Sequence, residues 1–178
     1  MVIRCVNRMN RWAFTNRLVS DLKLIEGGSK WEHRIRTFSD KEMKHILNDI
    51  TPHHFQLFVR FAYYTGARRG EIAHLTQENI KDEYAIVEGK TGLRMVKFNL
   101  QAQAILRAQN KLWDYTKDFV SHKFKKECRK LNIKDARFHD LRRTFGYSLI
   151  KQGMSIYKVS KLLGHSSVRT TEKHYAPL

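Results

Sequence analysis

The sequence is poor in cysteine and contains no long apolar run. Its two cysteines, Cys5 and Cys128, exclude a disulfide framework and a cysteine-rich metal site. No apolar stretch approaches the ~20 residues that span a bilayer, and residues 1–10 lack the apolar core of a signal peptide. We therefore expect a soluble protein that works in a reducing, intracellular compartment.

Acidic residues are scarce as well. The 17 Asp and Glu residues face 34 Lys and Arg residues, which gives a formal net charge of +17. The basic residues are spread along the chain rather than gathered in a tail, and this favours a polyanionic partner, DNA or RNA. A generically basic protein is the alternative. With 178 residues, 42% of them hydrophobic, the chain can build one domain with a core but not two full ones.

Helix signals dominate the chain, so we predict a mainly α fold (α+β) with one small β-element. Ser39 and Glu42 have the spacing of a capping box and predict the start of a helix. Pro52 is expected at the first position of the next helix, which Gly66 ends. A short helix is expected over residues 68–75.

Two β-prone runs, residues 84–88 and 94–98, flank the Gly-containing turn 89–92 and predict a hairpin. The rest of the chain after this hairpin shows helical patterns. These helices are expected at about residues 100–113, 116–131, 139–152, 155–163 and 167–174.

The start of the chain differs from the remainder. Residues 10–25 predict a basic amphipathic helix, and residues 27–29 (Gly-Gly-Ser) predict a linker. We therefore divide the chain into a helix-plus-linker segment, residues 1–30, and one domain, residues 31–178.

Two separated segments carry basic residues at positions suited to phosphate chemistry. Arg68 follows the end of a helix and opens a short one, where its guanidinium fork can bind an anion, and Glu71 lies three residues further on the same face. Lys90 is at the tip of the predicted hairpin and can reach toward a leaving oxygen. A solvated basic turn is the alternative for Arg68, and an ordinary surface turn is the alternative for Lys90.

Four further candidates lie in the C-terminal part of the chain. His139 and Arg142 are three residues apart on a predicted helix, where one can move a proton and the other can neutralise charge. His165 lies at a corner between two helices, and Tyr175 ends the last helix; their alternatives are a capping histidine and a core anchor. A phenol needs cationic neighbours to act as a nucleophile, because its free pKa is ~10. A metal phosphohydrolase would need further His and carboxylate ligands, which we do not find at suitable spacing.

Together and in this order, the motifs resemble the tyrosine recombinases of the phage integrase family. The resemblance extends from about Phe38 to Ala176. The family pattern is an Arg in T-G-x-R-x-x-E, a Lys on a β-hairpin, H-x-x-R, L-G-H-S and a C-terminal Tyr, which here are Arg68 with Glu71, Lys90, His139 with Arg142, His165 and Tyr175.

Motif register decides two assignments. It selects Arg68 rather than its neighbour Arg69. Many members of the family have the tyrosine nine residues after the L-G-H histidine, where this chain has His174. Members that end in K-H-Y-A have the tyrosine ten residues after it, which matches Tyr175.

The resemblance implies the catalytic domain of a site-specific DNA recombinase or integrase with the DNA breaking-rejoining fold. Tyr175 would attack a phosphodiester and form a 3′-phosphotyrosine without a metal, another cofactor or ATP. Arg68, Arg142 and His165 would bind the non-bridging oxygens, and Lys90 would protonate the leaving oxygen. His139 would assist proton transfer, and Glu71 would position its neighbours.

The same resemblance implies the partners and the setting. These are a specific double-stranded DNA site, a homo-tetramer of the full-length enzyme on DNA (with this chain alone a monomer) and no membrane. We expect a bacterial or phage-encoded protein of the cytoplasm, associated with the nucleoid. Residues 1–30 would be the last helix and linker of a core-binding domain, so the chain is expected to be a fragment or a truncated product.

Three alternative functions remain at this point. A type IB topoisomerase-like enzyme uses the same tyrosine chemistry without a specific site. A DNA-binding integrase fragment would lack activity, although every motif position is filled here. A metal-dependent nuclease would be sensitive to EDTA.

Overall fold

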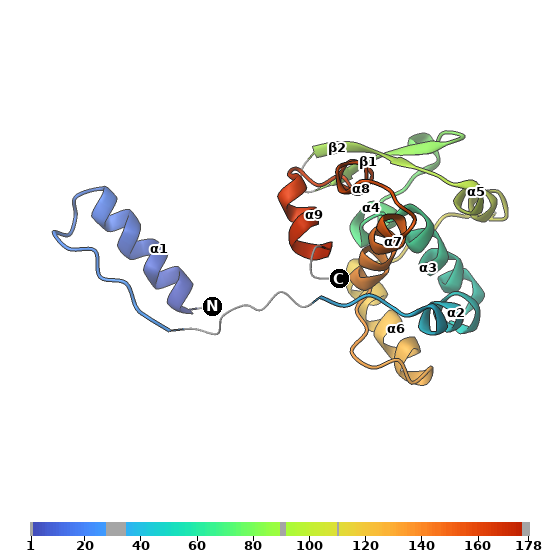
Figure 1. Ribbon diagram of the computed structural model, residues 1–178, viewed down its shortest axis with the longest axis horizontal. Helices are drawn as coiled ribbons and strands as arrows, with labels where there is room; N and C mark the ends of the chain where they lie inside the picture. The colour runs from blue at the N-terminus through green and yellow to red at the C-terminus, as the bar shows by residue number, and fades with distance from the viewer. Residues whose placement is uncertain (1, 28–34, 90–91, 110, 176–178) are drawn as a thin grey trace. The chain divides into compact units, whose positions relative to one another are not determined.

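The computed structural model describes residues 2–27, 35–89, 92–109 and 111–175. The chain divides into two compact units, residues 1–34 and 35–178, and each is considered by itself (Figure 1). The predicted boundary at residue 30 lies outside the described residues, so that division of the chain stays a prediction. None of the described helices is both long and apolar enough to cross a bilayer.

The first unit consists of helix α1 (Val2–Thr15) and a returning segment. Asn7 exchanges two hydrogen bonds with the backbone of Ile25, at 3.0 and 2.8 Å. The predicted helix over residues 10–25 is wrong, because α1 begins eight residues earlier and ends at Thr15. The side chains of Thr15 and Asn16 bond back to carbonyls one turn earlier, which satisfies the helix end.

The second unit is mainly helical with one two-stranded antiparallel sheet, which confirms the predicted fold class. In Figure 1 the hairpin runs along one side of this unit and α6 lies on the side away from it. Its described elements are α2 (Asp40–Asp49), α3 (His53–Thr65), α4 (Arg69–Ala73), the 3-10 turn η1 (Gln77–Asn79), β1 (Tyr84–Gly89), β2 (Gly92–Lys97), α5 (Leu100–Arg107), α6 (Lys117–Lys130), α7 (His139–Lys151), α8 (Ile156–Leu163) and α9 (Val168–Tyr175).

Local sequence signals explain several of these helix ends. The Ser39 hydroxyl accepts from the Glu42 amide while the Glu42 carboxylate accepts from the Ser39 amide, which confirms the capping box. Gly66 ends α3 in the left-handed conformation, as predicted. Pro52, however, is the cap before α3 rather than its first residue.

Helix α5 is shorter than the sequence indicates, ending at Arg107 instead of about residue 113. The indole of Trp113 is 3% exposed and donates to the His54 carbonyl at 3.0 Å. Burial of this large ring against α3 draws the chain away from the α5 axis, so tertiary packing overrides the helical pattern.

The core is built around α3. Phe55, Phe58 and Phe61 are fully buried at helical spacing, and Phe58 packs against both Trp113 and Phe138. A second, smaller cluster joins α7, α8 and α9 through buried apolar side chains. Helix α7 of this cluster also packs against α3.

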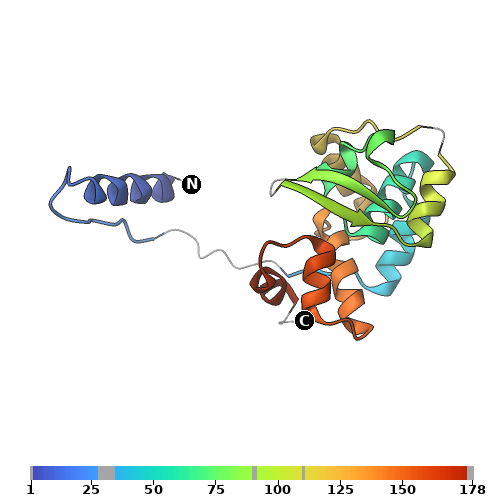
Figure 2. The same ribbon diagram turned by 90° about the horizontal axis from the view of Figure 1, so that it is seen from above.

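The hairpin pairs Tyr84 with Lys97 at its open end and Gly89 with Gly92 at its turn. Ala85, Val87 and Val96 face the core, which follows from the two-residue period of a strand. Figure 2 shows the two strands side by side, and Arg94 of β2 donates a hydrogen bond to the Leu162 carbonyl of α8. Strand β2 thus lies beside the end of α8, where the L-G-H-S motif begins.

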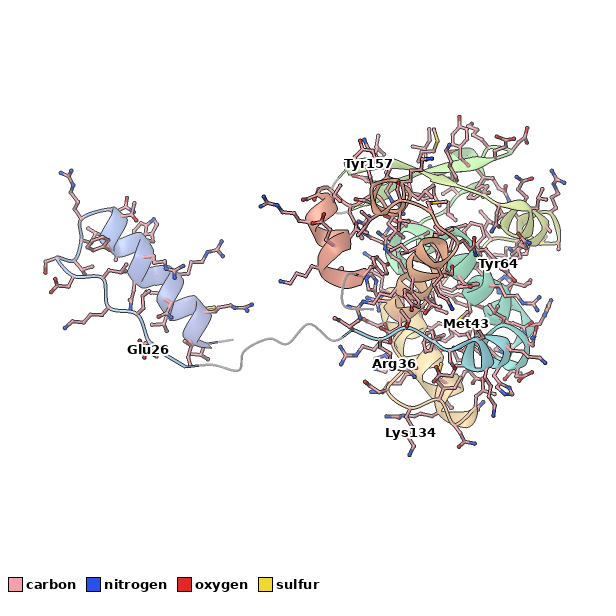
Figure 3. All side chains as sticks on the ribbon, viewed as in Figure 1. Glu26, Arg36, Met43, Tyr64, Lys134 and Tyr157 are labelled. Atoms are coloured by element: carbon pink, nitrogen blue, oxygen red, sulfur yellow. The ribbon has the colours of Figure 1, made fainter. Side chains whose placement is uncertain are left out.

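Hydrogen bonds hold the segment before α2 against the rest of the second unit. Arg36 donates to the Glu42 carboxylate at 2.8 Å and to the Lys134 carbonyl at 2.9 Å, and Figure 3 shows Arg36 and Lys134 close together. The Phe38 amide donates to the Thr144 hydroxyl on α7 at 2.9 Å. These contacts give α7 a fixed position in the unit.

Because Phe58 is fully buried among aromatic rings, we expect Phe58→Ala to lower the free energy of unfolding of the second unit by about 3–5 kcal/mol. Phe119→Ala is the matched control, since its ring is 45% exposed and should cost less than half as much. Urea unfolding followed by tryptophan fluorescence measures both. Equal losses would contradict this description of the core.

Candidate active site

Arg142 on α7 joins the C-terminal ends of two helices. Its guanidinium donates to the Gly66 carbonyl after α3 at 2.6 Å and to the Leu163 carbonyl at the end of α8. Helix C-termini carry partial negative charge, so both carbonyls stabilise the cation. Burial, and then the neighbouring charges of Arg68 and Arg94, lower the pKa of Arg142 to about 9. The group is therefore charged at neutral pH although it is only 3% exposed.

Arg68 meets Arg142 at the end of α8. Its guanidinium donates to the Gly164 carbonyl at 2.9 Å and to Glu71 Oε1 at 2.7 Å. The side chain is 28% exposed, so part of the guanidinium faces solvent. Two cations thus converge on the consecutive carbonyls of Leu163 and Gly164.

Glu71 is a buried carboxylate shared between two arginines. It accepts from Arg68 and also from Arg94 on β2, whose Nε and Nη2 lie 2.9 and 2.7 Å from its two oxygens. Burial alone would raise its pKa, but the hydrogen bonds and charge of Arg94, followed by those of Arg68, lower the pKa to about 2. Glu71 is therefore ionised throughout the physiological range.

Sequence reasoning missed Arg94. The signal that would have found it is the strand period, because Arg94 lies two residues before the buried Val96 and so shares its inward face. An arginine that faces inward on a strand needs a buried acidic partner, and Glu71 is that partner.

The two histidines lie in the field of these cations. His165 Nδ1 is 2.7 Å from the hydroxyl of Thr171, a fully buried residue of α9. Burial, then the charges of Arg142 and Arg68, lower the pKa of His165 to about 4. The His165 ring is therefore neutral at pH 7. His139 is the first residue of α7 and keeps an exposed face. Partial burial of its ring, and then the charges of Arg142 and Arg143, lower the pKa of His139 as well.

Tyr175 ends α9 in a buried seat against α7. Its phenol donates a long hydrogen bond of 3.5 Å to the Arg142 carbonyl, and the residue is 6% exposed. A Cβ added to Gly146 would lie 2.3 Å from the phenolic oxygen, so only glycine leaves room for this ring. Burial raises the pKa of Tyr175 to about 12, although the charges of Arg142 and Arg143 act in the opposite direction.

The structure brings most of the predicted site residues into one region. Hydrogen bonds connect Arg68 and Glu71 with the end of α8, and Arg142 and Tyr175 reach the same region from α7 and α9. Lys90 lies outside the described residues. Within the described part of the chain, no group of three or more His, Cys, Asp or Glu residues is placed to hold a metal ion.

The fold is that of the catalytic domains of phage and transposon integrases. The catalytic domain of bacteriophage HP1 integrase has the same fold (TM-score 0.65, 19% identity, covering 79% of this chain and 87% of that one). The Tn1549 transposon integrase, solved in complex with circular intermediate DNA, superposes with a TM-score of 0.74 at 15% identity, over 97% of this chain and 75% of that one.

Sequence comparison adds relatives of the same kind. Residues 115–178 match the Phage integrase family, and the chain is 28% identical over 149 residues to the tyrosine recombinase XerA of Saccharolobus solfataricus. That match covers 78% of this chain and 51% of XerA, so the chain spans about half the length of this relative. The C-terminal part of the chain is therefore similar to the phage integrase family, and the match to XerA extends this similarity to tyrosine recombinases over most of the chain.

The close approach at Gly146 gives a test of the Tyr175 seat. Replacing a glycine within a helix by alanine ordinarily adds about 0.5–1 kcal/mol of stability. We expect Gly146→Ala to lower stability instead and to shift the ring signals of Tyr175 in NMR spectra, because the new methyl occupies the place of the phenol.

Gly70→Ala is the control for this substitution. Its Cβ would meet only the end of the Lys117 side chain at 2.8 Å, which can move aside. Unfolding in urea compares the two variants. A stabilised Gly146→Ala protein with unmoved Tyr175 signals would show that the phenol does not occupy this seat.

Proposed function

We propose that this chain is the catalytic domain of a site-specific DNA recombinase, with Tyr175 as the nucleophile. The observation that carries the proposal is the convergence of two guanidinium groups at the end of α8 with a phenol bonded to the backbone of Arg142. Two fixed cations next to a hydroxyl nucleophile are suited to transfer of a phosphoryl group from a phosphodiester to that hydroxyl.

The reaction exchanges one phosphodiester for another. The Tyr175 oxygen forms a bond to phosphorus and loses its proton, while the bond from phosphorus to the 5′-oxygen of DNA breaks. The DNA then remains attached as a 3′-phosphotyrosine, and the leaving oxygen takes up a proton to become a 5′-hydroxyl. Attack by a second 5′-hydroxyl reverses these steps and rejoins the strands, so no ATP is consumed.

The cations act on charge that grows at the non-bridging oxygens. Each guanidinium carries five N–H donors, so Arg68 and Arg142 have donors left for phosphate beyond those given to carbonyls. With His165 Nδ1 accepting the Thr171 proton, its Nε2 carries a hydrogen and donates to the same phosphate. Removal of one such donor typically lowers the rate by about a hundredfold or more.

The remaining roles concern protons and position. His139 lies in the field of Arg142 and assists removal of the Tyr175 proton or supports the phosphate. Lys90 protonates the leaving 5′-oxygen, and Glu71 fixes Arg68.

DNA is the proposed partner. The net charge of +17 supports binding to a polyanion, and relatives of this fold were solved with DNA, as in XerH bound to its difH substrate. The finer assignments, a specific double-stranded site, a tetramer on DNA and residence with the nucleoid in the cytoplasm, are part of this proposal. The topoisomerase and inactive-fragment alternatives are not favoured, because the relatives are recombinases and integrases.

The nucleophile is tested with DNA that carries a p-nitrophenyl phosphodiester at its 3′ end. Attack by Tyr175 releases p-nitrophenolate, which needs no general acid and thus no contribution from Lys90. We expect wild-type protein to form a covalent adduct, visible as a band of lower mobility on a denaturing gel. Tyr175→Phe should form none while binding DNA with nearly unchanged affinity. Tyr157→Phe, at a 56% exposed position, is the control and should react normally.

An adduct in Tyr175→Phe, or none in the wild type, would refute the assignment. An unchanged adduct after EDTA treatment is expected, and its loss would favour a metal-dependent nuclease instead.

Arg142 should affect chemistry far more than binding. On the same substrate we expect Arg142→Ala to slow adduct formation at saturating DNA by roughly a hundredfold or more, with a much smaller change in Kd. Arg107→Ala removes an exposed arginine at the end of α5 and should change the rate little. Arg142→Lys keeps the charge but loses the fork, so it separates folding defects from catalytic ones. If the rate of adduct formation in all three variants fell only in proportion to the rise in Kd, the catalytic role of Arg142 would be contradicted.

A further inference from the structure

We propose that Arg94 is a positioning residue of this pocket: it fixes the Arg68 guanidinium through Glu71 and fixes the end of α8 through Leu162. This inference rests on the proposed function in one respect, that the reaction Arg94 supports is the proposed phosphodiester transfer. The contacts of Arg94 that support it all lie within this chain.

Three nitrogens of Arg94 bind three protein acceptors. Nε and Nη2 contact the two oxygens of Glu71, and Nη1 donates to the Leu162 carbonyl at 3.1 Å. The side chain is 11% exposed. A paired, fork-like contact of this kind holds both groups in one geometry. Because every Arg94 nitrogen has a protein partner, we assign it to positioning rather than to contact with substrate.

The contacts of Glu71 show how this position reaches Arg68. Oε1 accepts from Arg68 Nη1 at 2.7 Å as well as from Arg94 Nε, and Oε2 accepts from the Arg68 amide at 2.6 Å as well as from Arg94 Nη2. Each oxygen thus has one donor from each arginine. With Arg94 absent, the carboxylate loses half of its donors and is free to rotate, and Arg68 loses its fixed support.

Two glycines leave room for this arrangement. A Cβ on Gly164 would lie 2.6 Å from Arg94 Cδ, and a Cβ on Gly89 would lie 3.0 Å from Glu71 Oε1. Gly164 also has a φ of +63°, which favours glycine for a second reason. The glycine of the L-G-H-S motif, Gly164, therefore leaves space for the Arg94 side chain and also ends α8.

The positive charge of Arg94 explains how this residue would affect the reaction rate. Arg68, Arg94 and Arg142 surround one carboxylate, so the cluster keeps an excess of positive charge for a phosphate. Without Arg94, Glu71 would pair with Arg68 alone and cancel most of the charge that Arg68 offers. A residue that only held the fold would not change the rate at saturating DNA in this manner.

The experiment uses the full chain and the p-nitrophenyl DNA substrate described above. We expect Arg94→Gln to slow adduct formation at saturating DNA by at least about tenfold, while Kd changes by no more than about threefold. Arg94→Lys, which restores the charge without the fork, should recover part of the rate. Lys97→Gln removes an exposed charge from the same strand and is the control, with a rate near that of wild type.

A double-mutant comparison tests the route through Glu71. In a Glu71→Gln background, adding Arg94→Gln should lower the rate by less than about twofold, because the pathway is already broken. A wild-type rate in Arg94→Gln, or independent and multiplicative effects of the two substitutions, would overturn the inference.

A second measurement does not depend on activity. The carboxyl carbon of Glu71 is followed by NMR as pH falls in DNA-free protein, with the urea midpoint recorded to show that each variant is folded. In the wild type Glu71 should stay ionised to about pH 2, and in Arg94→Gln it should take up its proton at clearly higher pH. No change in this titration would overturn the inference even if recombination chemistry is confirmed. A changed titration in a chain that forms no adduct would instead refute the proposed function alone.

Discussion

Buried arginine side chains bonded to helix-terminal carbonyls hold this site together. Arg142 binds the carbonyls of Gly66 and Leu163, and Arg68 binds the carbonyl of Gly164. A buried cation is costly unless it is paired, and carbonyls at helix C-termini supply negative potential without adding a full negative charge. The cluster therefore keeps a net positive charge, which a second carboxylate at this place would have removed.

This arrangement constrains the backbone around it. Both α3 and α8 must end where their last carbonyls face the arginines, and a left-handed glycine ends each of them. Gly146 serves a different need, since it allows the Tyr175 ring to lie against α7. The glycines of the pocket are thus explained by helix ends and by close approaches of side chains.

Much of this could be predicted from the sequence, because helix caps, a hairpin turn and short motifs depend on neighbouring residues. The capping box at Ser39, the end of α3 at Gly66 and the strands of the hairpin are of this kind. The errors arose where distant contacts decide: α5 ends early because Trp113 packs on α3, and Arg94 has a partner 23 residues away. The site was predictable as a set of motifs, but the contacts that orient its members were not.

The protonation states of the free chain follow from the same burial and charge. Burial and positive charge keep the pKa of His165 low, while burial keeps the pKa of Tyr175 high. The site thus combines a neutral phenol and the neutral imidazole of His165 with charged guanidinium groups, whose positive charge attracts an anion. Ionisation of the Tyr175 phenol therefore requires a proton acceptor close to its oxygen.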